Sequence, residues 1–224
     1  MSTPARGRVG DLRPALLSGL EVLSVSLDEE QIGKLLQYLD LLVTWNSAFN
    51  LSGVRDPQEM LSRHLLDSLS IHAAVQGTRV LDIGTGAGLP GIPLAIALPG
   101  SSLHLLDSNG KKMRFLFEVK SRLGLENVTL LQTRAEELPP VPSFDTVLSR
   151  AVGTLGDLLR LAGPVLADDG VLLAMKSAPS HEELSQILRP YTLRSISELV
   201  VPGASTPRHL VCIARMPGQD GNTA

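Results

Sequence analysis

Apolar residues recur at helical spacing in the first third of the chain. A first helix is predicted after Asp28, a favourable N-cap residue that is followed by two glutamates in the first turn. Its apolar positions are Ile32, Leu35, Leu36, Leu39, Leu42 and Val43. A second helix is predicted after Asp56, with Pro57 in its first position and Gly77 at its end. We therefore expect residues 1–77 to form a helical extension.

From residue 78 the pattern changes to short β-rich runs that alternate with helices. The predicted strands are 79–83, 103–107, 128–132, 144–149 and 170–176, and the predicted helices are 90–98, 109–123, 155–166 and 180–188. Such alternation predicts a parallel sheet that is covered by helices on both faces.

Two further β-rich runs, 191–201 and 209–214, have no helix between them. They should pair as an antiparallel hairpin at the edge of the sheet. We therefore expect an α/β domain over residues 78–216, with a mostly parallel sheet of seven strands and an antiparallel last strand. The polar residues 217–224 are expected to form a disordered tail.

Composition narrows the class of protein. Apolar residues make up 43% of the chain, which is enough for a sizeable core, and the net charge of −3 gives no general basic character. A nucleic-acid partner would therefore need a local basic patch. The single cysteine, Cys212, lies in an apolar run and is expected to be buried and inert. Since there is no signal-peptide pattern and no apolar run of roughly 18 residues, we expect a cytoplasmic protein that does not enter the membrane.

The segment from Val80 to Gly91 carries the most chemical information. An apolar strand runs into Gly84, Gly86 and Gly88, and Pro90 then opens a helix. Glycine lets the backbone turn tightly and leaves no Cβ between the backbone and a ligand. Asp107 follows about twenty residues later, at the end of the next predicted strand, where a carboxylate can bind the ribose hydroxyls of a nucleoside cofactor.

Two cofactors are compatible with this turn. Gly86, Gly88 and Gly91 also satisfy the GxGxxG pattern of dinucleotide-binding proteins, so an NAD-dependent oxidoreductase is one alternative. A tight turn without any ligand is another. Asp82, two residues before Gly84, favours S-adenosylmethionine, because a carboxylate at this place can hold a cationic or hydroxylated ligand. The terminal hairpin favours the same cofactor, since it resembles the reversed last strand of class I methyltransferases.

The fourth predicted strand limits the reaction. It ends at Arg150 and lacks the Asn or Asp, two prolines and aromatic residue of methyltransferases that act on exocyclic amines. Enzymes that methylate a pyrimidine carbon need a cysteine nucleophile, and Cys212 is far along the chain on a different predicted strand. Methyl transfer to an atom with a free lone pair, such as guanine N7, is the reaction that remains. This reaction needs no general base, so no catalytic residue is predicted. Arg150 is expected to contact the cofactor's carboxylate or an RNA phosphate, with a surface ion pair as the alternative.

A series of short motifs gives the chain a more specific resemblance. They are Trp45-Asn46, Phe49 to Ser52, Arg63 to Ser68, Asp82 to Gly91 with Pro93, Leu106 to Ser108, Arg134 to Glu137, Ser149 to Ala151, Lys176 and Arg208 to Val211. In this order they resemble the glucose-inhibited division protein B family, the small-subunit rRNA guanine-N7 methyltransferases. One departure is Ser177, where that family often has glycine.

The resemblance implies a class I methyltransferase fold and the cofactor S-adenosylmethionine. The cofactor contacts would come from Gly84, Leu89, Ala135, Glu136 and Arg150, together with Asp82, Gly86, Gly88, Asp107 and Ser108. The target would be a guanosine in a decoding-region loop of 16S rRNA, presented as naked RNA, a small subunit or an assembly intermediate. A non-catalytic RNA-binding module with the same fold is the remaining alternative.

Basic side chains are then candidates for RNA contacts. These are Arg63, His64, Lys176, Arg208 and His209. The run of Lys111, Lys112, Arg114, Lys120 and Arg122 could serve in the same way or be a solvated helix face. The two histidines lack metal-ligand spacing, so no metal site is expected. We also expect the protein to act as a monomer.

Overall fold

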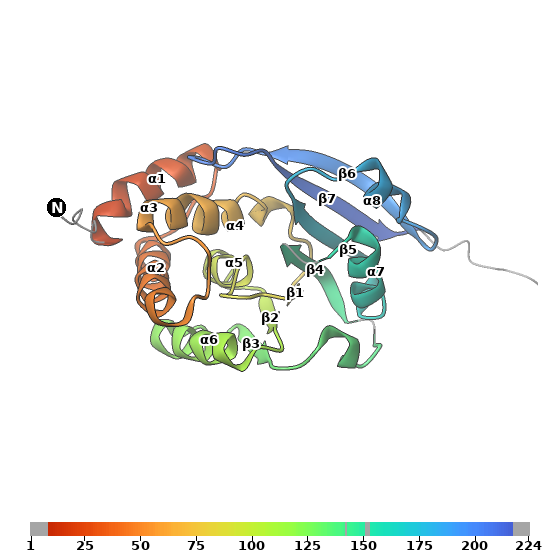
Figure 1. The fold of residues 1–224 in the computed structure, drawn as a ribbon, viewed down its shortest axis with the longest axis horizontal. Helices are drawn as coiled ribbons and strands as arrows, with labels where there is room; N and C mark the ends of the chain where they lie inside the picture. Colours follow the sequence, from red (N-terminus) through yellow and green to blue (C-terminus); the bar gives the residue numbers. More distant parts are fainter. Residues whose placement is uncertain (1–8, 142, 151–152, 217–224) are drawn as a thin grey trace, which may run out of the picture.

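The computed structural model describes residues 9–141, 143–150 and 153–216 and shows a central sheet between two layers of helices (Figure 1). The strands are β1 (Arg79–Ile83), β2 (Ser102–Leu106), β3 (Val128–Leu131), β4 (Phe144–Arg150), β5 (Leu166–Lys176), β6 (Tyr191–Leu199) and β7 (Arg208–Arg215). Their order is β3-β2-β1-β4-β5-β7-β6. Strands β1 to β5 are parallel, whereas β7 is antiparallel to both β5 and β6. The predicted seven-stranded fold with its terminal hairpin is confirmed.

Helices cover both faces of this sheet (Figure 1). One face carries α1 (Arg13–Val22), α2 (Glu29–Phe49), α3 (Pro57–Met60), α4 (Asp67–Leu69), α5 (Gly91–Ala97) and α6 (Gly110–Leu123), and the other carries α7 (Leu155–Ala162) and α8 (His181–Ser185). Successive strand residues point to opposite faces, so Val80 belongs to the first apolar cluster while Leu81 and Ile83 belong to the second. This explains why the strands read as continuous apolar runs rather than as alternating patterns.

The first 77 residues supply part of the core. Apolar residues of α1 to α4 belong to the same buried cluster as those of α5, α6 and one face of the sheet. The described part of the expected helical extension, from Val9 on, therefore packs onto the sheet, and the first strand begins at Arg79. The tail predicted for 217–224 lies outside the described residues.

Local capping explains where the N-terminal helices begin. The Asp28 side chain accepts a hydrogen bond from the backbone of Gln31 (2.8 Å), and the Gln31 side chain accepts one from the backbone of Asp28 (3.0 Å). This capping box starts α2 where the sequence predicted it. The Asp56 side chain caps α3 by accepting hydrogen bonds from the backbone of Gln58 and Glu59, with Pro57 in the first position.

Beyond α3 the predicted second helix is divided. Residues Leu61–Leu66 form a π-helical turn, η2, which leads into α4, and His72–Ala74 form a 3₁₀ turn, η3. A π turn contains one more residue than an α turn and leaves no distinct trace in apolar spacing, so the pattern read as one continuous helix. Such turns are frequent at functional sites, and this one contains Arg63 and His64.

Two other helices differ from expectation. The short α1 precedes the first helix that the pattern predicted, and α8 ends at Ser185 instead of continuing to residue 188. A third difference is that α7 ends at Ala162 instead of residue 166, because β5 begins at Leu166, before the predicted residue 170. Among the residues that the structure describes, no helix has both the length and the apolar character needed to cross a membrane.

Tyr38 joins the helical layer to the turn after β1. Its side chain is fully buried on α2, and its hydroxyl donates a 2.7 Å hydrogen bond to the carbonyl oxygen of Ala87. Burial raises the pKa of Tyr38 far above its usual value, so the hydroxyl stays protonated and remains a donor. Residues 38 and 87 are distant in sequence, so this contact ties the N-terminal helices to the glycine-rich segment.

Tyr38→Phe is expected to lower the free energy of unfolding by about 1–2 kcal/mol, because the Ala87 carbonyl loses its buried donor while the ring is retained. Urea denaturation followed by circular dichroism measures the change. Tyr191→Phe is the matched control, since in the described part of the chain the hydroxyl of Tyr191 makes no hydrogen bond. Equal stability of the two variants would show that the Tyr38 contact contributes nothing.

Candidate functional site

The turn after β1 uses its glycines in two different ways. Gly86 has φ +63°, and a Cβ added to it would meet no atom closer than the Gly84 carbonyl oxygen at 3.9 Å and Lys112 Nζ at 4.0 Å. Gly88 has φ +92°, and its Cβ would come within 2.5 Å of Ile92 and 2.7 Å of Leu116. Gly86 therefore leaves room on the open side of the turn, whereas Gly88 allows the turn to pack against α5 and α6.

Asp82 supports this turn from inside the sheet. It is fully buried, and its Oδ2 accepts hydrogen bonds from Thr85 Oγ1 (2.7 Å) and the Gly91 backbone (2.9 Å). Its Oδ1 has no hydrogen-bond partner among the described residues. Burial raises the pKa of Asp82 to about 6. The sequence predicted a direct cofactor contact here, but the carboxylate lies beneath the turn, where it braces the backbone.

Asp107 lies just beyond the end of β2, on the other side of the turn. Its Oδ2 accepts from the Gly86 backbone (3.0 Å) and from Lys112 Nζ (3.1 Å), and its Oδ1 accepts from the Asn109 backbone (2.9 Å). Ser108, the next residue, is exposed. The contact of Asp107 with the ribose of a nucleoside cofactor stays a prediction.

A cavity of about 620 Å³ opens beside the turn at the carboxyl ends of β1, β4 and β5. Its lining comprises Leu51, Ser52, Gly53, Val54, Arg63, His64, Gly84, Thr85, Gly86, Ala87, Leu89, Arg150, Met175, Lys176, Ser177 and Arg208. The size is typical of small-molecule sites. Among these described residues four side chains are Arg or Lys and none is Asp or Glu, so the cavity favours anionic ligands.

Asp67 organises the arginines of this cavity. It is almost fully buried at the start of α4, with Oδ2 3.0 Å from Arg150 Nη1 and Oδ1 3.3 Å from Arg208 Nε. Arg150 Nη1 also donates to the carbonyl oxygen of Arg63 (3.0 Å). The ion pair considered as the alternative for Arg150 is present, but its partner is buried instead of lying at the surface. Within the described residues only Nη1 of Arg150 is hydrogen-bonded, which leaves Nε and Nη2 for a ligand.

His64 lines the cavity as a neutral side chain. It is 6% exposed, its Nε2 lies 2.7 Å from Ser52 Oγ, and its Nδ1 donates to the carbonyl oxygen of Arg63 (2.9 Å). Burial, followed by the charge of Arg150, lowers the pKa of His64 to about 4. The predicted phosphate contact would need a charged or accessible imidazole, and the structure provides neither near neutral pH.

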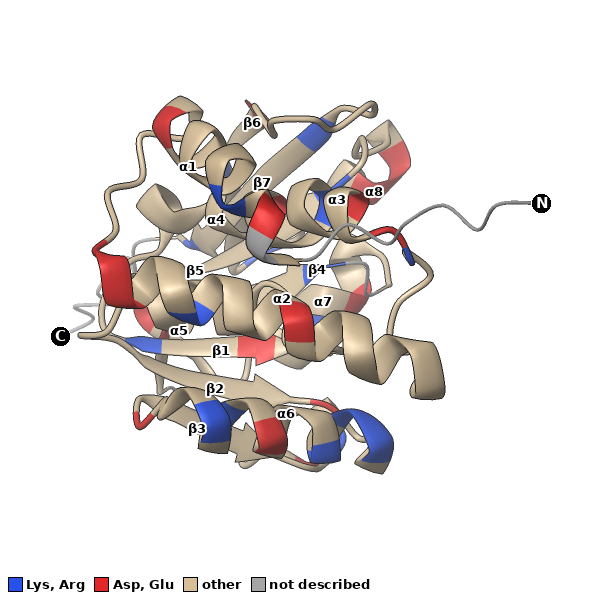
Figure 2. Ribbon diagram, turned by 90° about the vertical axis from the view of Figure 1, so that its left-hand side faces the viewer, with Lys and Arg blue, Asp and Glu red and all other residues tan. Residues whose placement is uncertain are grey.

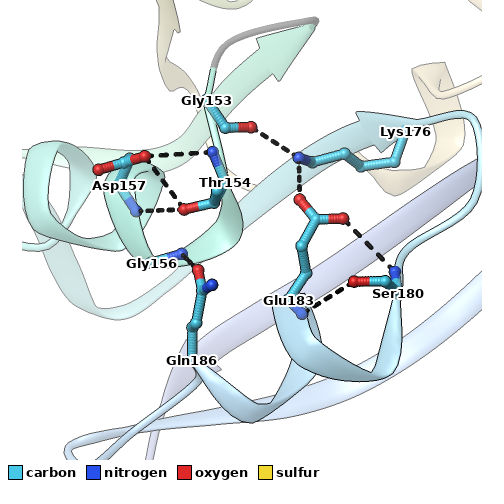
Figure 3. Close-up of polar contacts among 8 residues, drawn as sticks. All are labelled: Gly153, Thr154, Gly156, Asp157, Lys176, Ser180, Glu183 and Gln186. Carbon is cyan, nitrogen blue, oxygen red and sulfur yellow. Dashed lines mark hydrogen bonds and ion pairs between the residues drawn. The ribbon is translucent and has the colours of Figure 1, made fainter.

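Lys176 connects the end of β5 to two neighbouring segments. Figure 3 shows its Nζ between the carbonyl oxygen of Gly153 (2.7 Å) and Oε1 of Glu183 (2.5 Å). The Lys176 hydrogen bond is the main reason that the pKa of Glu183 lies below its usual value. Glu183 also caps α8 together with Ser180. Lys176, predicted as an RNA contact, therefore fixes the chain beside the cavity.

Other predicted residues lie outside the cavity lining. Ala135 and Glu136 form the short turn η4 (Ala135–Glu137) after β3, where Ala135 is half-buried and Glu136 exposed. His209 donates from Nδ1 to the carbonyl oxygen of Ser177 (2.6 Å), so it orders the loop that follows Lys176. In the described part of the chain, no group of three or more His, Cys, Asp or Glu residues is placed to hold a metal ion.

The family model described as GidB, rRNA small subunit methyltransferase G, matches residues 31–211. The chain belongs to this family. It is 46% identical to ribosomal RNA small subunit methyltransferase G of Stenotrophomonas maltophilia (strain K279a) over 190 residues, covering 85% of this chain and 90% of that protein. It is 44% identical to the protein of the same name from Enterobacter sp. (strain 638), covering 87% of this chain and 94% of that one.

Solved structures agree on the fold. TrmN from Thermus thermophilus has a TM-score of 0.54 at 21% identity and covers 70% of this chain and 53% of its own. TYW2 of M. jannaschii, solved in complex with AdoMet, has a TM-score of 0.54 at 16% identity and covers 67% of this chain and 74% of its own. The class I methyltransferase fold is thus confirmed, and membership of the family decides for S-adenosylmethionine over NAD.

Sequence reasoning missed the residues that hold the site together. Asp67 stood within the motif Arg63 to Ser68 but was assigned no role, although a carboxylate among the apolar residues 65, 66 and 69 indicates a buried pair. Tyr38 and Ser52 gave no comparable indication, because the partner of Tyr38 is remote in sequence and Ser52 itself lies in a loop. Ala151, part of one family motif, lies outside the described residues.

Asp67→Asn is expected to lower the free energy of unfolding by about 2 kcal/mol, because it removes the charge that holds two partly buried arginines. Urea denaturation measures the loss. The control is Asp168→Asn, which removes a 91% exposed carboxylate 3.8 Å from Arg215 and should change stability by less than about 0.5 kcal/mol. Equal losses of stability in the two variants would show that burial does not strengthen the ion pairs of Asp67.

His64 should make the protein less stable in mild acid. Its folded pKa of about 4 lies below the ordinary 6.5, so the unfolded chain binds a proton more readily, and stability is lost as the pH falls from about 6.5 toward 4. Between pH 7 and pH 5 this amounts to about 2 kcal/mol. Urea denaturation of the wild type and of His64→Gln at both pH values measures the loss of stability, and the loss in the variant should be smaller by this amount. Any contribution of Asp82 is the same in both proteins. An identical decline in the variant would contradict the buried, neutral imidazole.

Proposed function

We propose that this member of the family transfers the methyl group of S-adenosylmethionine to N7 of a guanosine in a decoding-region loop of 16S rRNA. The observation that carries the proposal is the cavity beside the glycine turn, which is lined by Arg63, Arg150, Lys176 and Arg208 and, among the residues the structure describes, by no carboxylate. A polyanionic substrate would be attracted to such a site, and a reaction that needs a carboxylate base would not be served by it.

The chain's residues fit the cofactor in three regions. Gly84, Gly86 and Leu89 line the cavity at the turn, and we assign them to the cofactor together with the free nitrogen atoms of Arg150. Asp107 and Ser108 would meet the ribose. The turn of Ala135 and Glu136 would lie beside the adenine. The role of Gly88 would be indirect, through packing.

The cofactor would supply an electrophilic methyl group on a sulfonium ion. Guanine N7 carries a lone pair and no proton, so the protein has no proton to remove, and its contribution is to align the base and exclude water. The state of His64 agrees with this, since the imidazole is neutral and both ring nitrogens are engaged. The arginines of the cavity would then neutralise RNA phosphates rather than take part in proton transfer.

The RNA would approach past Arg63 and Arg208. Both side chains line the main cavity and also a smaller hollow of about 210 Å³, which Asp67 and residues 204–206 complete. Arg63 is half exposed, and its Nη1 lies 3.6 Å from Oε2 of Glu59. This is a loose ion pair, in which an RNA phosphate could take the place of the Glu59 carboxylate. We further propose that the protein works as a monomer in the cytoplasm, where its single cysteine would remain reduced.

The decisive experiment incubates the purified protein with labelled S-adenosylmethionine and with small subunits or 16S rRNA from cells that lack this methyl group, and then maps the labelled nucleotide. One guanosine methylated at N7 is expected. Label on another atom or on another class of RNA would overturn the proposal, and binding without turnover would favour the non-catalytic module.

Arg150→Gln should lower kcat/KM roughly 100-fold through lost charge-assisted contacts. The control is Arg160→Gln, which changes a side chain that is 64% exposed and should leave kcat/KM at the wild-type value.

A further inference from the structure

Helix α6 concentrates positive charge in an otherwise acidic chain. Its 14 residues, GKKMRFLFEVKSRL, contain five of the chain's 20 Lys and Arg residues and a single glutamate. The net charge of the whole chain is −3. Because an acidic protein is repelled by polyanions at long range, a local excess of this kind is the feature that would allow it to hold RNA.

The position of these charges opposes the stability of the helix. Lys111, Lys112 and Arg114 lie near the N-terminus of α6, and its first turn contains no acidic residue. The N-terminus of a helix bears the positive end of the helix dipole, so cations there are unfavourable. Helix α2 shows the favourable arrangement, with Glu29 and Glu30 in its first turn. A charge pattern that local stability disfavours indicates a role outside the helix.

The outer face of α6 combines cations with an uncovered aromatic ring. Lys111, Arg114 and Phe117 are spaced three residues apart, which places them on one face, and all three are exposed, Phe117 at 66%. Neither Lys111 nor Arg114 forms an ion pair with any described residue, whereas Arg122 pairs with Glu118 at 2.5 Å. Exposed cations next to an aromatic ring match the needs of single-stranded RNA, with phosphates to neutralise and bases to stack.

The same end of α6 adjoins the candidate active site. Lys112 Nζ lies 3.1 Å from Asp107 Oδ2, and that oxygen accepts the backbone hydrogen bond of Gly86 in the glycine turn. Figure 2 shows the basic residues at this end of α6 beside the tips of the β1 and β2 arrows, the edge of the sheet where the turn lies. An RNA strand whose target base enters the cavity could therefore continue across α6.

We propose that the face formed by Lys111, Arg114 and Phe117 is a second RNA-binding surface outside the cavity. Lys111 and Arg114 bind backbone phosphates of the substrate RNA, and Phe117 stacks on an unpaired base. This inference rests on the proposed function, since it assigns an additional contact to the same RNA. Of the two interpretations of the basic run on α6, it takes the RNA contact for Lys111 and Arg114.

The test uses the double variant Lys111→Gln/Arg114→Gln in the full-length protein, with 16S rRNA lacking the methyl group. Loss of two phosphate contacts should reduce the slope of log Kd against log salt by about 1.5, so that the wild type loses roughly tenfold more affinity than the variant between 50 and 200 mM salt. Turnover at saturating RNA and affinity for S-adenosylhomocysteine should not change. The charge-matched control, Arg160→Gln/Arg194→Gln, removes exposed arginines from α7 and from the edge strand β6 and should keep the wild-type slope.

Two further readouts separate binding from folding. Phe117→Leu should weaken RNA binding about tenfold without altering the salt slope, because it removes stacking and no charge. The thermal midpoint of the double variant should equal or exceed that of the wild type, since its lost cations opposed the helix dipole. An unchanged salt slope, or a lowered midpoint, would overturn the α6 surface. Failure of the wild type to methylate rRNA would instead overturn the proposed function.

Discussion

The site depends on a backbone turn that is held from two sides. Asp82 binds Thr85 and the Gly91 backbone from within the sheet, and Tyr38 binds the Ala87 carbonyl from the helical layer. A turn with several left-handed glycines would otherwise be free to take many conformations, because glycine loses more backbone freedom on folding than any other residue. Buried hydrogen bonds on both sides restrict the turn to one conformation, and this conformation determines the shape of the adjacent wall of the cavity.

Charge in the cavity is organised by a single buried carboxylate. Asp67 contacts Arg150 from β4 and Arg208 from β7, so three remote parts of the chain meet at one point. Two guanidinium groups around one carboxylate leave an excess of positive charge, which an RNA phosphate can neutralise. Lys176 binds Glu183 and the carbonyl oxygen of Gly153, so the end of β5 beside the cavity is held in place as well (Figure 3). The protein thus combines a net negative charge with local basic surfaces at the cavity and on α6.

Periodicity and turn chemistry predicted most of the elements from local information. The capping box of Asp28 and Gln31, the strand pattern after residue 78 and the glycine turn are all written in short stretches of sequence. The π turn at Leu61–Leu66 was not, because it changes hydrogen bonding without changing the apolar pattern. The surroundings of His64 and Lys176 were not visible in the sequence either, since burial keeps one neutral and a neighbouring glutamate engages the other.

The sequence by itself determined the strand–helix alternation, the reversed last strand, the position of the glycine turn and the resemblance to a methyltransferase family. Each depends on residues that are close together in the chain or on motifs that can be read in order. Only the tertiary structure decided that Asp82 braces the turn, that Asp67 holds two arginines and that Tyr38 reaches Ala87. Those roles depend on burial and on partners that are remote in sequence, and the cost of leaving a buried polar group unpaired is what makes the fold bring these groups together.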